Sequence, residues 1–254
     1  MSFDVAADMY GRFMGRYADE LAVRFADAAG VTPGLRALDV GCGPGALTAE
    51  LVARLGPDAV AGVDPSAPFV AAARERLPHV EVLRASAEQL PFPDDGFDVT
   101  LAQLVVHFMT DPVAGLREMA RVTRPGGVVA ACVWDHAGER GPLTVFWRAV
   151  RALDPRARDE SGLAGVGEGQ LAELFATAGL RDVRSTVLTV RASFASFEEW
   201  WEPYTFGVAP AGEYVKGLDA AGRAALRDRC ASMFPAEGPL ELTASAWAAV
   251  GLTG

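Results

Sequence analysis

The strongest constraint on the fold is a regular alternation of short apolar runs with helix-forming stretches between residues 36 and 134. The apolar runs cover residues 36–40, 59–63, 80–84, 97–104 and 128–134, and the helical patterns cover 46–55, 69–77 and 112–122. Such alternation is typical of crossover units, in which a helix connects two parallel strands. Several runs are apolar at every position, as expected for strands covered by helices on both faces. The region is therefore predicted to form a doubly wound α/β sheet.

The segments around this region carry other patterns. Residues 1–30 have the apolar spacing of a helix that ends at Gly30, and residues 124–127 are expected to form a turn. Beyond residue 136 we expect a helix over 168–180, a half-exposed strand over 183–194, an irregular aromatic-rich segment, a helix over 220–234 and a last strand over 240–250.

The first strand of the region ends in a glycine-rich turn. Gly41, Gly43 and Gly45 follow an apolar run and precede a predicted helix, so a ligand could approach the backbone closely and face the amides of the helix start. Asp64 ends the next predicted strand, where a carboxylate can accept hydrogen bonds from ribose hydroxyls. This context indicates a nucleotide-cofactor site.

Two cofactor classes use such a turn, dinucleotides and S-adenosyl-L-methionine. Asp39, two residues before the first glycine, would crowd a pyrophosphate with negative charge, whereas it suits a ligand with a sulfonium and an ammonium group. Pro44 removes an amide that would cradle phosphate. The residues favour S-adenosyl-L-methionine, and a nicotinamide-dependent oxidoreductase stays as the alternative.

Charge and cysteine content exclude several other classes. The formal net charge of −10 makes long nucleic acid, RNA included, a poor partner. The three cysteines lie far apart, and no group of His, Cys and Asp has metal-ligand spacing, so we expect no disulfide framework and no metal. The apolar segments are shorter than the roughly 20 residues that cross a bilayer. We expect a cytoplasmic protein without membrane contact, as a monomer or homodimer.

The motifs of residues 35–135, taken in order, resemble those of class I SAM-dependent methyltransferases of the small-molecule type, similar to quinone-biosynthesis methyltransferases. The matching segments are Leu38–Gly45, Gly62–Ser66, Ala85–Asp98, Gln103–His107 and Arg124–Gly127. The resemblance implies a Rossmann-like seven-stranded sheet, mostly parallel with the last strand antiparallel, and helices on both faces. It also implies one domain, with a helical N-terminal cap (1–30), a SAM-binding core (35–135), a helical connection (136–182) and a lid insertion (195–236).

The resemblance also implies roles for particular residues. The backbone of Gly41, Cys42 and Gly43 would contact the methionine part of the cofactor, Asp39 would hold its ammonium group, and Gly45 is a further cofactor-binding residue. The ribose would be bound by Asp64, Pro65 and Ser66. The adenine would be framed by Ser86, Ala87 and Glu88, and the floor of the site would be formed by Gln103 and Leu104. Tyr10 and Arg16 resemble residues that fold over the cofactor, and Arg16 could pair with its carboxylate. Many relatives carry Asp where this chain has Ser86, which can accept one hydrogen bond but lacks the charge.

Two features bear on the methyl acceptor. His107 is the candidate catalytic residue, as a general base or as a group that positions the acceptor, with a plain structural role as the alternative. His79 and His136 are expected to be solvated. The aromatic residues of 194–206 are expected to pack a lid onto the core or to wall a pocket for a small apolar or aromatic acceptor. The leading hypothesis is SAM-dependent methyl transfer to O, N or C of such a molecule, with S-adenosyl-L-homocysteine as product. A non-catalytic SAM-binding protein is a further alternative.

Overall fold

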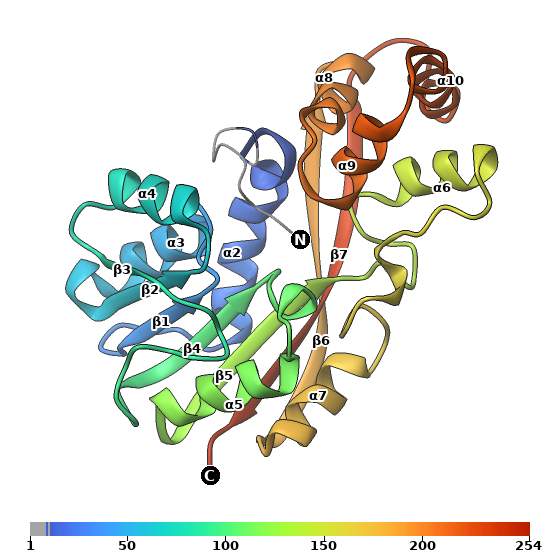
Figure 1. Ribbon diagram of the computed structural model, residues 1–254. Helices are drawn as coiled ribbons and strands as arrows, with labels where there is room; N and C mark the ends of the chain where they lie inside the picture. The colour runs from blue at the N-terminus through green and yellow to red at the C-terminus, as the bar shows by residue number, and fades with distance from the viewer. Residues whose placement is uncertain (1–8, 10) are drawn as a thin grey trace.

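The computed structural model describes Met9 and residues 11–254. Its centre is a seven-stranded sheet with strand order β3-β2-β1-β4-β5-β7-β6 (Figure 1). The strands are β1 (Ala37–Val40), β2 (Val60–Asp64), β3 (Glu81–Arg84), β4 (Phe97–Gln103), β5 (Thr123–Trp134), β6 (Arg181–Phe194) and β7 (Leu240–Leu252). Strands β1 to β5 pair in parallel, whereas β7 is antiparallel to both β5 and β6. The predicted Rossmann-like sheet with an antiparallel last strand is confirmed.

Helices cover both faces of the sheet, as the fully apolar strands require. Helices α2 (Arg16–Ala28), α3 (Ala46–Leu55) and α4 (Ala67–Arg76) lie on one face, and α5 (Pro112–Val122) and α7 (Gln170–Ala178) lie on the other. Strand side chains alternate between the two layers, so that Ala37 packs with α2 and α3, whereas Leu38 packs with α5. A turn of π-helix, Gly11–Gly15, precedes α2.

The order of the strands places a crevice at the carboxyl end of β1. The chain moves outward from β1 to β2 and β3, then returns to the opposite side of β1 to form β4. The connections after β1 and β4 therefore leave the sheet in different directions, and open α/β sheets bind ligands at such a point. This is the edge at which the glycine turn lies.

The segment between β6 and β7 is more helical than its sequence indicates. It contains α8 (Phe197–Trp201), a 3-10 helix (Glu202–Phe206), α9 (Ala209–Gly217) and α10 (Ala220–Ala231). These helices, with α6 (Thr144–Leu153), lie at the far end of β6 and β7, which extend past the other strands (Figure 1). The prediction of an irregular segment was wrong. Its helices are only five to nine residues long, and periodicity is hard to detect over so short a length.

The expected turn at residues 124–127 is instead part of β5. The pairing partners change from Phe97 with Thr123 to Val99 with Val128, so residues 124–127 form an irregularity inside the strand. Pro125 and the left-handed backbone of Gly126 explain why the sequence resembles a turn at this point. In the described part of the chain, no helix is long and apolar enough to span a membrane.

Candidate active site

The glycine turn after β1 is fixed by its contacts with β2 and with the loop after β4. The amides of Gly41 and Cys42 both donate to the carbonyl of Val63, at 2.7 and 2.9 Å. Gly41 has a φ of 72°, and a Cβ on it would lie 2.4 Å from a methyl group of Val105. Only glycine meets both conditions. Gly43 also has a positive φ of 52°, but nothing lies within 4 Å of the place a Cβ would take.

Asp39, the penultimate residue of β1, has a buried carboxyl group, and one of its two oxygens accepts no hydrogen bond from the described residues. Its Oδ2 accepts a hydrogen bond of 2.6 Å from Thr48 Oγ1 on α3. Its Oδ1 is buried and has no partner among the described residues. Burial raises the pKa of Asp39 to about 7, and the nearby Asp64 adds to that increase. A cationic group placed at Oδ1 would both satisfy the oxygen and favour the ionised form.

Asp64, at the end of β2, is held in one orientation by two backbone amides. Its Oδ2 accepts from Gly43 N at 2.9 Å, and its Oδ1 accepts from Ser66 N at 2.8 Å. Each oxygen keeps a second lone pair. Burial is the main reason that the pKa of Asp64 is raised, and the two amides partly offset it. The carboxylate therefore links the glycine turn to the start of α4 and can still accept from a ligand.

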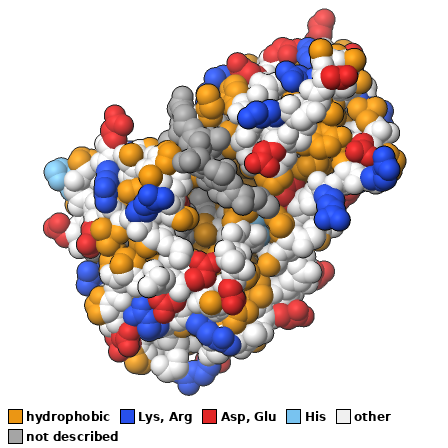
Figure 2. Space-filling view, viewed as in Figure 1, with side chains coloured by type: hydrophobic (Ala, Val, Ile, Leu, Met, Phe, Trp, Pro, Cys, Tyr) orange, Lys and Arg blue, Asp and Glu red, His pale blue; other side chains and the backbone are white. Residues whose placement is uncertain are grey.

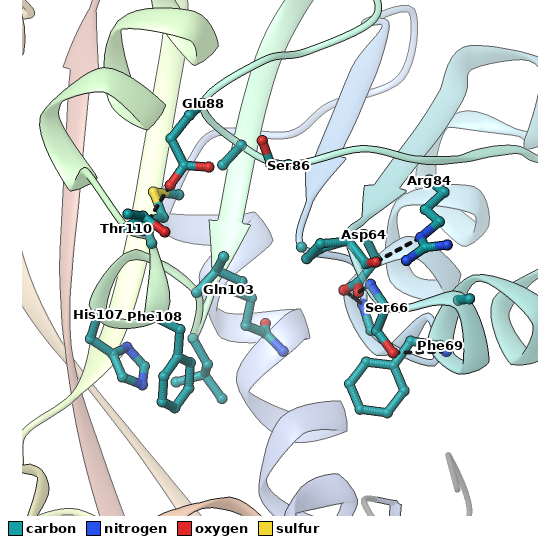
Figure 3. A pocket seen from close by; sticks show the side chains of 18 residues that line it. Asp64, Ser66, Phe69, Arg84, Ser86, Glu88, Gln103, His107, Phe108 and Thr110 are labelled. Atoms are coloured by element: carbon teal, nitrogen blue, oxygen red, sulfur yellow. Dashed lines mark hydrogen bonds between the residues drawn. The ribbon is translucent and has the colours of Figure 1, made fainter. Parts of the chain in front are cut away.

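Two adjoining cavities open along this edge of the sheet. The larger has a volume of about 620 Å³ and the smaller about 350 Å³. Both are lined by Gly41, Gly43, Gln103 and Leu104, so the glycine turn and the end of β4 form the junction between them. Figure 3 shows the larger cavity, with Asp64, Ser66 and Arg84 on one side and Ser86 and Glu88 on another.

The structure brings most of the predicted residues to these two cavities. The larger cavity is lined by Gly41, Gly43, Asp64, Pro65, Ser66, Ser86, Ala87, Glu88, Gln103, Leu104 and His107. The smaller cavity adds Arg16, Asp39 and Cys42. Gly45 lines neither; its left-handed backbone precedes α3, and its missing side chain makes room for Leu77. Tyr10 lies outside the described residues.

Glu88 is tied to the loop after β4. Its Oε1 accepts hydrogen bonds from the backbone amides of Thr110, at 2.8 Å, and Asp111, at 3.3 Å. The carboxylate thereby holds Thr110 against the cavity. Ser86 is exposed, and Ala87 is buried beneath it. An adenine edge placed here would meet one hydroxyl and the backbone of this loop.

The end of β4 forms the floor of the junction. Gln103 donates from Nε2 to the carbonyl of Ala18 on α2 at 3.0 Å, whereas its buried Oε1 has no partner among the described residues. Leu104 has a φ of 63°, an uncommon conformation for a side chain of this kind, and turns the chain sharply into the short 3-10 helix Val106–Phe108.

Arg16 lines the smaller cavity but is engaged with the insertion. Its guanidinium donates to the carbonyl of Ser193 at 2.7 Å and pairs with Glu199 on α8. It also lies over the ring of Phe194, 5.1 Å from the centroid. Arg16 therefore connects the rim of the cavity to the far end of β6.

His107 lies in the 3-10 helix after β4 and is only 6% exposed. Its Nδ1 is buried and has no partner among the described residues. Its ring is 3.9 Å from that of Phe108 and 6.2 Å from that of His136. Burial lowers the pKa of His107 to about 3, and His136 adds to the effect. His79 is exposed as expected, whereas His136 is half-buried, because the loop after β5 packs it against His107.

Several cavity residues were not singled out in the sequence. They are Ala67, Phe69, Arg84, Val105, Phe108, Met109 and Thr110. Arg84 is the last residue of β3. Val105 lies inside the predicted Gln103–His107 segment, and Phe108–Thr110 directly follow it. The rule that ligands bind at carboxyl ends of parallel strands could have found both. Phe69 lies in the first turn of α4, and no pattern in the sequence predicts that it lines the cavity.

The buried atoms fit S-adenosyl-L-methionine. Asp39 Oδ1 offers a partner for an ammonium group, Asp64 keeps lone pairs for hydroxyls, and the open side of Gly43 allows close approach to the backbone. Among the described residues, no group of three or more His, Cys, Asp and Glu is placed to hold a metal ion.

Comparison with known proteins agrees with this geometry. Residues 38–131 match the family model described as a methyltransferase domain. An uncharacterized methyltransferase of Mycobacterium sp. (strain JLS) is 35% identical over 216 residues, covering 80% of this chain and 84% of the relative. The demethylmenaquinone methyltransferase of Geobacillus stearothermophilus is 30% identical over 198 residues, covering 70% and 78%.

A solved structure shows the same fold. The phospholethanolamine N-methyltransferase 2 of Haemonchus contortus, in complex with S-adenosylhomocysteine, has a TM-score of 0.60 and 17% identity, covering 99% of this chain and 58% of that one. The fold and the site thus define a class I SAM-dependent methyltransferase. The chain belongs to this methyltransferase family, and S-adenosyl-L-methionine is its methyl donor.

Proposed function

We propose that this enzyme transfers a methyl group to an oxygen, nitrogen or carbon atom of a small, neutral, apolar or aromatic molecule. The observation that carries the proposal is the composition of the larger cavity beyond Asp64. Its wall there is formed by Leu104 and Phe108, with Phe69 on the other side of the cavity (Figure 3). The pKa of His107 is lowered to about 3 by burial, so its imidazole is uncharged near pH 7. Apolar walls with few polar groups favour a ligand that is itself mostly apolar.

The donor is proposed to lie across the junction of the two cavities. Asp39 would hold its ammonium group and Arg16 its carboxylate in the smaller cavity, with Gly41, Cys42 and Gly43 along the backbone between. Asp64, Pro65 and Ser66 would bind the ribose, and Ser86, Ala87 and Glu88 would frame the adenine in the larger cavity. The chemistry supplied by bound S-adenosyl-L-methionine is a methyl group activated by a positively charged sulfur.

The protein's part in such a reaction is to align the acceptor and exclude water. Holding two reactants in line converts a bimolecular encounter into a unimolecular one, which can supply roughly 7–11 kcal/mol of the barrier. Gln103 and Leu104 form a floor shared by both cavities, so an acceptor resting against Phe108 would face the donor across that floor. Gly45 would act only indirectly, by starting α3.

The relatives and the surface charge support a small acceptor. One relative is named for demethylmenaquinone, a quinone, which is consistent with an aromatic ring in the acceptor site. On the face shown in Figure 2, Lys and Arg side chains are scattered among Asp and Glu, and the net charge of the chain is −10. Nucleic-acid binding requires clustered positive charge.

The three cysteines are free and buried, which supports a reducing, cytoplasmic location.

The test is transfer of a radiolabelled methyl group from S-adenosyl-L-methionine to a panel of acceptors. Neutral phenols, quinols and aromatic amines should be methylated, whereas their carboxylated or sulfonated analogues and RNA should not. Transfer restricted to RNA or to charged molecules would refute the proposed acceptor class. Binding of the donor without transfer to any member of a broad neutral panel would favour the non-catalytic alternative.

A further inference from the structure

Beside the acceptor end of the larger cavity, one buried polar atom has no partner among the described residues. His107 Nδ1 is enclosed and accepts or donates no hydrogen bond within the described residues. His107 lines the cavity next to Phe108 (Figure 3). A buried polar group left unpaired costs roughly 1–3 kcal/mol. Such a cost is recovered when a ligand supplies the missing partner.

The charge state of the imidazole limits what that partner can be. Burial and the neighbouring His136 both disfavour protonation, and the pKa of His136 is itself lowered to about 4 by its own burial. Both rings are therefore neutral near pH 7, which keeps positive charge away from a cationic methyl donor. A neutral imidazole has one N–H donor and one bare acceptor nitrogen. Its weak basicity makes it a hydrogen-bond acceptor rather than a group that takes up a full proton.

We infer that His107 is a positioning residue for the acceptor, whose imidazole accepts a hydrogen bond from an O–H or N–H group on an otherwise apolar ring. The inference rests on the proposed function and narrows its substrate class to hydroxy- or amino-substituted aromatic molecules. The ring of the acceptor would pack on Phe108, and its polar hydrogen would orient the molecule toward the junction. The group bonded to His107 orients the substrate and need not be the atom that is methylated.

The probes are phenol and anisole, which differ in a single donor hydrogen. Binding of each is measured by NMR to protein saturated with S-adenosylhomocysteine, following the imidazole resonances of the three histidines. One hydrogen bond is worth about 0.5–1.5 kcal/mol, so phenol should bind roughly 2- to 10-fold more tightly than anisole. In His107→Phe the ratio should fall to about one. In His107→Asn, which keeps an acceptor oxygen, part of the preference should remain. His136→Phe is the control and should keep the preference.

Each other outcome overturns the inference. An equal affinity of phenol and anisole in the natural protein would overturn it, as would a phenol preference that survives in His107→Phe or disappears in His136→Phe. If S-adenosylhomocysteine binds but neither ring compound does, this inference fails while the cofactor assignment stands. If S-adenosylhomocysteine itself does not bind, the proposed function fails and this inference fails with it. Resonances of Phe108 that shift with phenol in His107→Phe would show that the variant is folded and its cavity intact.

Discussion

At the scale of single residues, a glycine can be required by the backbone conformation or by close approach of a ligand, and Gly43 allows the two reasons to be distinguished. Gly43 has a positive φ and an open Cβ position facing both cavities. Gly34 has a φ of 94° and an equally open Cβ position but lines neither cavity. Gly43→Ala and Gly34→Ala should each lower the free energy of unfolding by about 1–2 kcal/mol. Only Gly43→Ala should weaken S-adenosylhomocysteine binding, by about tenfold, in a calorimetric titration. Equal affinities in the two variants would contradict close backbone approach at Gly43.

The carboxylate of Asp39 should make donor binding depend on pH. Its pKa is about 7 in the free protein, so below pH 7 it must lose a proton before it can hold an ammonium group. Affinity for S-adenosylhomocysteine should therefore fall as the pH is lowered from 7.5 to 5.5, by up to about tenfold per pH unit below 7. Asp39→Asn should bind more weakly and show a flatter profile. Parallel profiles for the two proteins would rule out this role.

At the scale of secondary-structure elements, the N-terminal helix and the insertion are joined by arginine–glutamate pairs. Arg16 pairs with Glu199, and Arg12 pairs with Glu202 at 2.5 Å. Exposed pairs of this kind contribute only about 0–1 kcal/mol, so the two should be similar in their effect on stability. They differ in position, because Arg16 lines the smaller cavity and Arg12 lines neither.

Replacing these arginines tests whether Arg16 also serves the donor. Arg16→Gln should lower the affinity for S-adenosylhomocysteine about tenfold, since a charge-assisted hydrogen bond to its carboxylate is lost. Arg12→Gln is the matched control and should leave the affinity unchanged. Glu199→Gln should leave it unchanged or raise it, because the guanidinium is then free for the ligand. The affinities of the three variants are measured by calorimetric titration. A similar loss of affinity in Arg12→Gln and Arg16→Gln would show that the arginine–glutamate pairs, and not a direct contact of Arg16 with the ligand, affect binding.

The elements also show how far the sequence could predict the molecule. Apart from the start of β5, the strands and helices of residues 37–134 follow from the sequence pattern, because β1 and β2 are buried on both faces and the strands alternate with helix-forming stretches. The cavity residues at strand ends, such as Asp64 and Gln103, follow from the same rule. Phe69 does not, because its place depends on how α4 packs. The short helices of the insertion were missed, since aromatic residues such as Trp200 and Trp201 are buried there by tertiary contacts rather than by a regular pattern.

At the scale of the whole molecule, a buried carboxyl outside the cavities should affect stability. Glu160 is 3% exposed, and burial raises its pKa from 4.5 to about 7. Below pH 4.5 the carboxyl is protonated whether the protein is folded or unfolded. As the pH rises to 7, the unfolded chain loses the proton first, so the folded state loses up to about 3 kcal/mol relative to it. His107 and His136 have lowered pKa values and act in the opposite direction.

The contribution of Glu160 is isolated by comparing two proteins. Glu160→Gln removes the ionisation while keeping the shape, so it should be more stable than the natural protein at pH 8 and nearly equal to it at pH 4.5. Urea unfolding at several pH values gives the difference directly. A difference that does not change with pH would mean that Glu160 has an ordinary pKa in the folded state.

The account as a whole depends on the cofactor lying at the junction of the two cavities. The most direct test is calorimetric titration of S-adenosyl-L-methionine and S-adenosylhomocysteine into the natural protein and into Asp64→Ala, with thermal unfolding to confirm that both are folded. We predict micromolar binding of both compounds to the natural protein and at least a tenfold loss in the variant, which lacks the carboxylate beside Gly43 and Ser66. Failure of the folded natural protein to bind either compound, or unchanged affinity in Asp64→Ala, would contradict it.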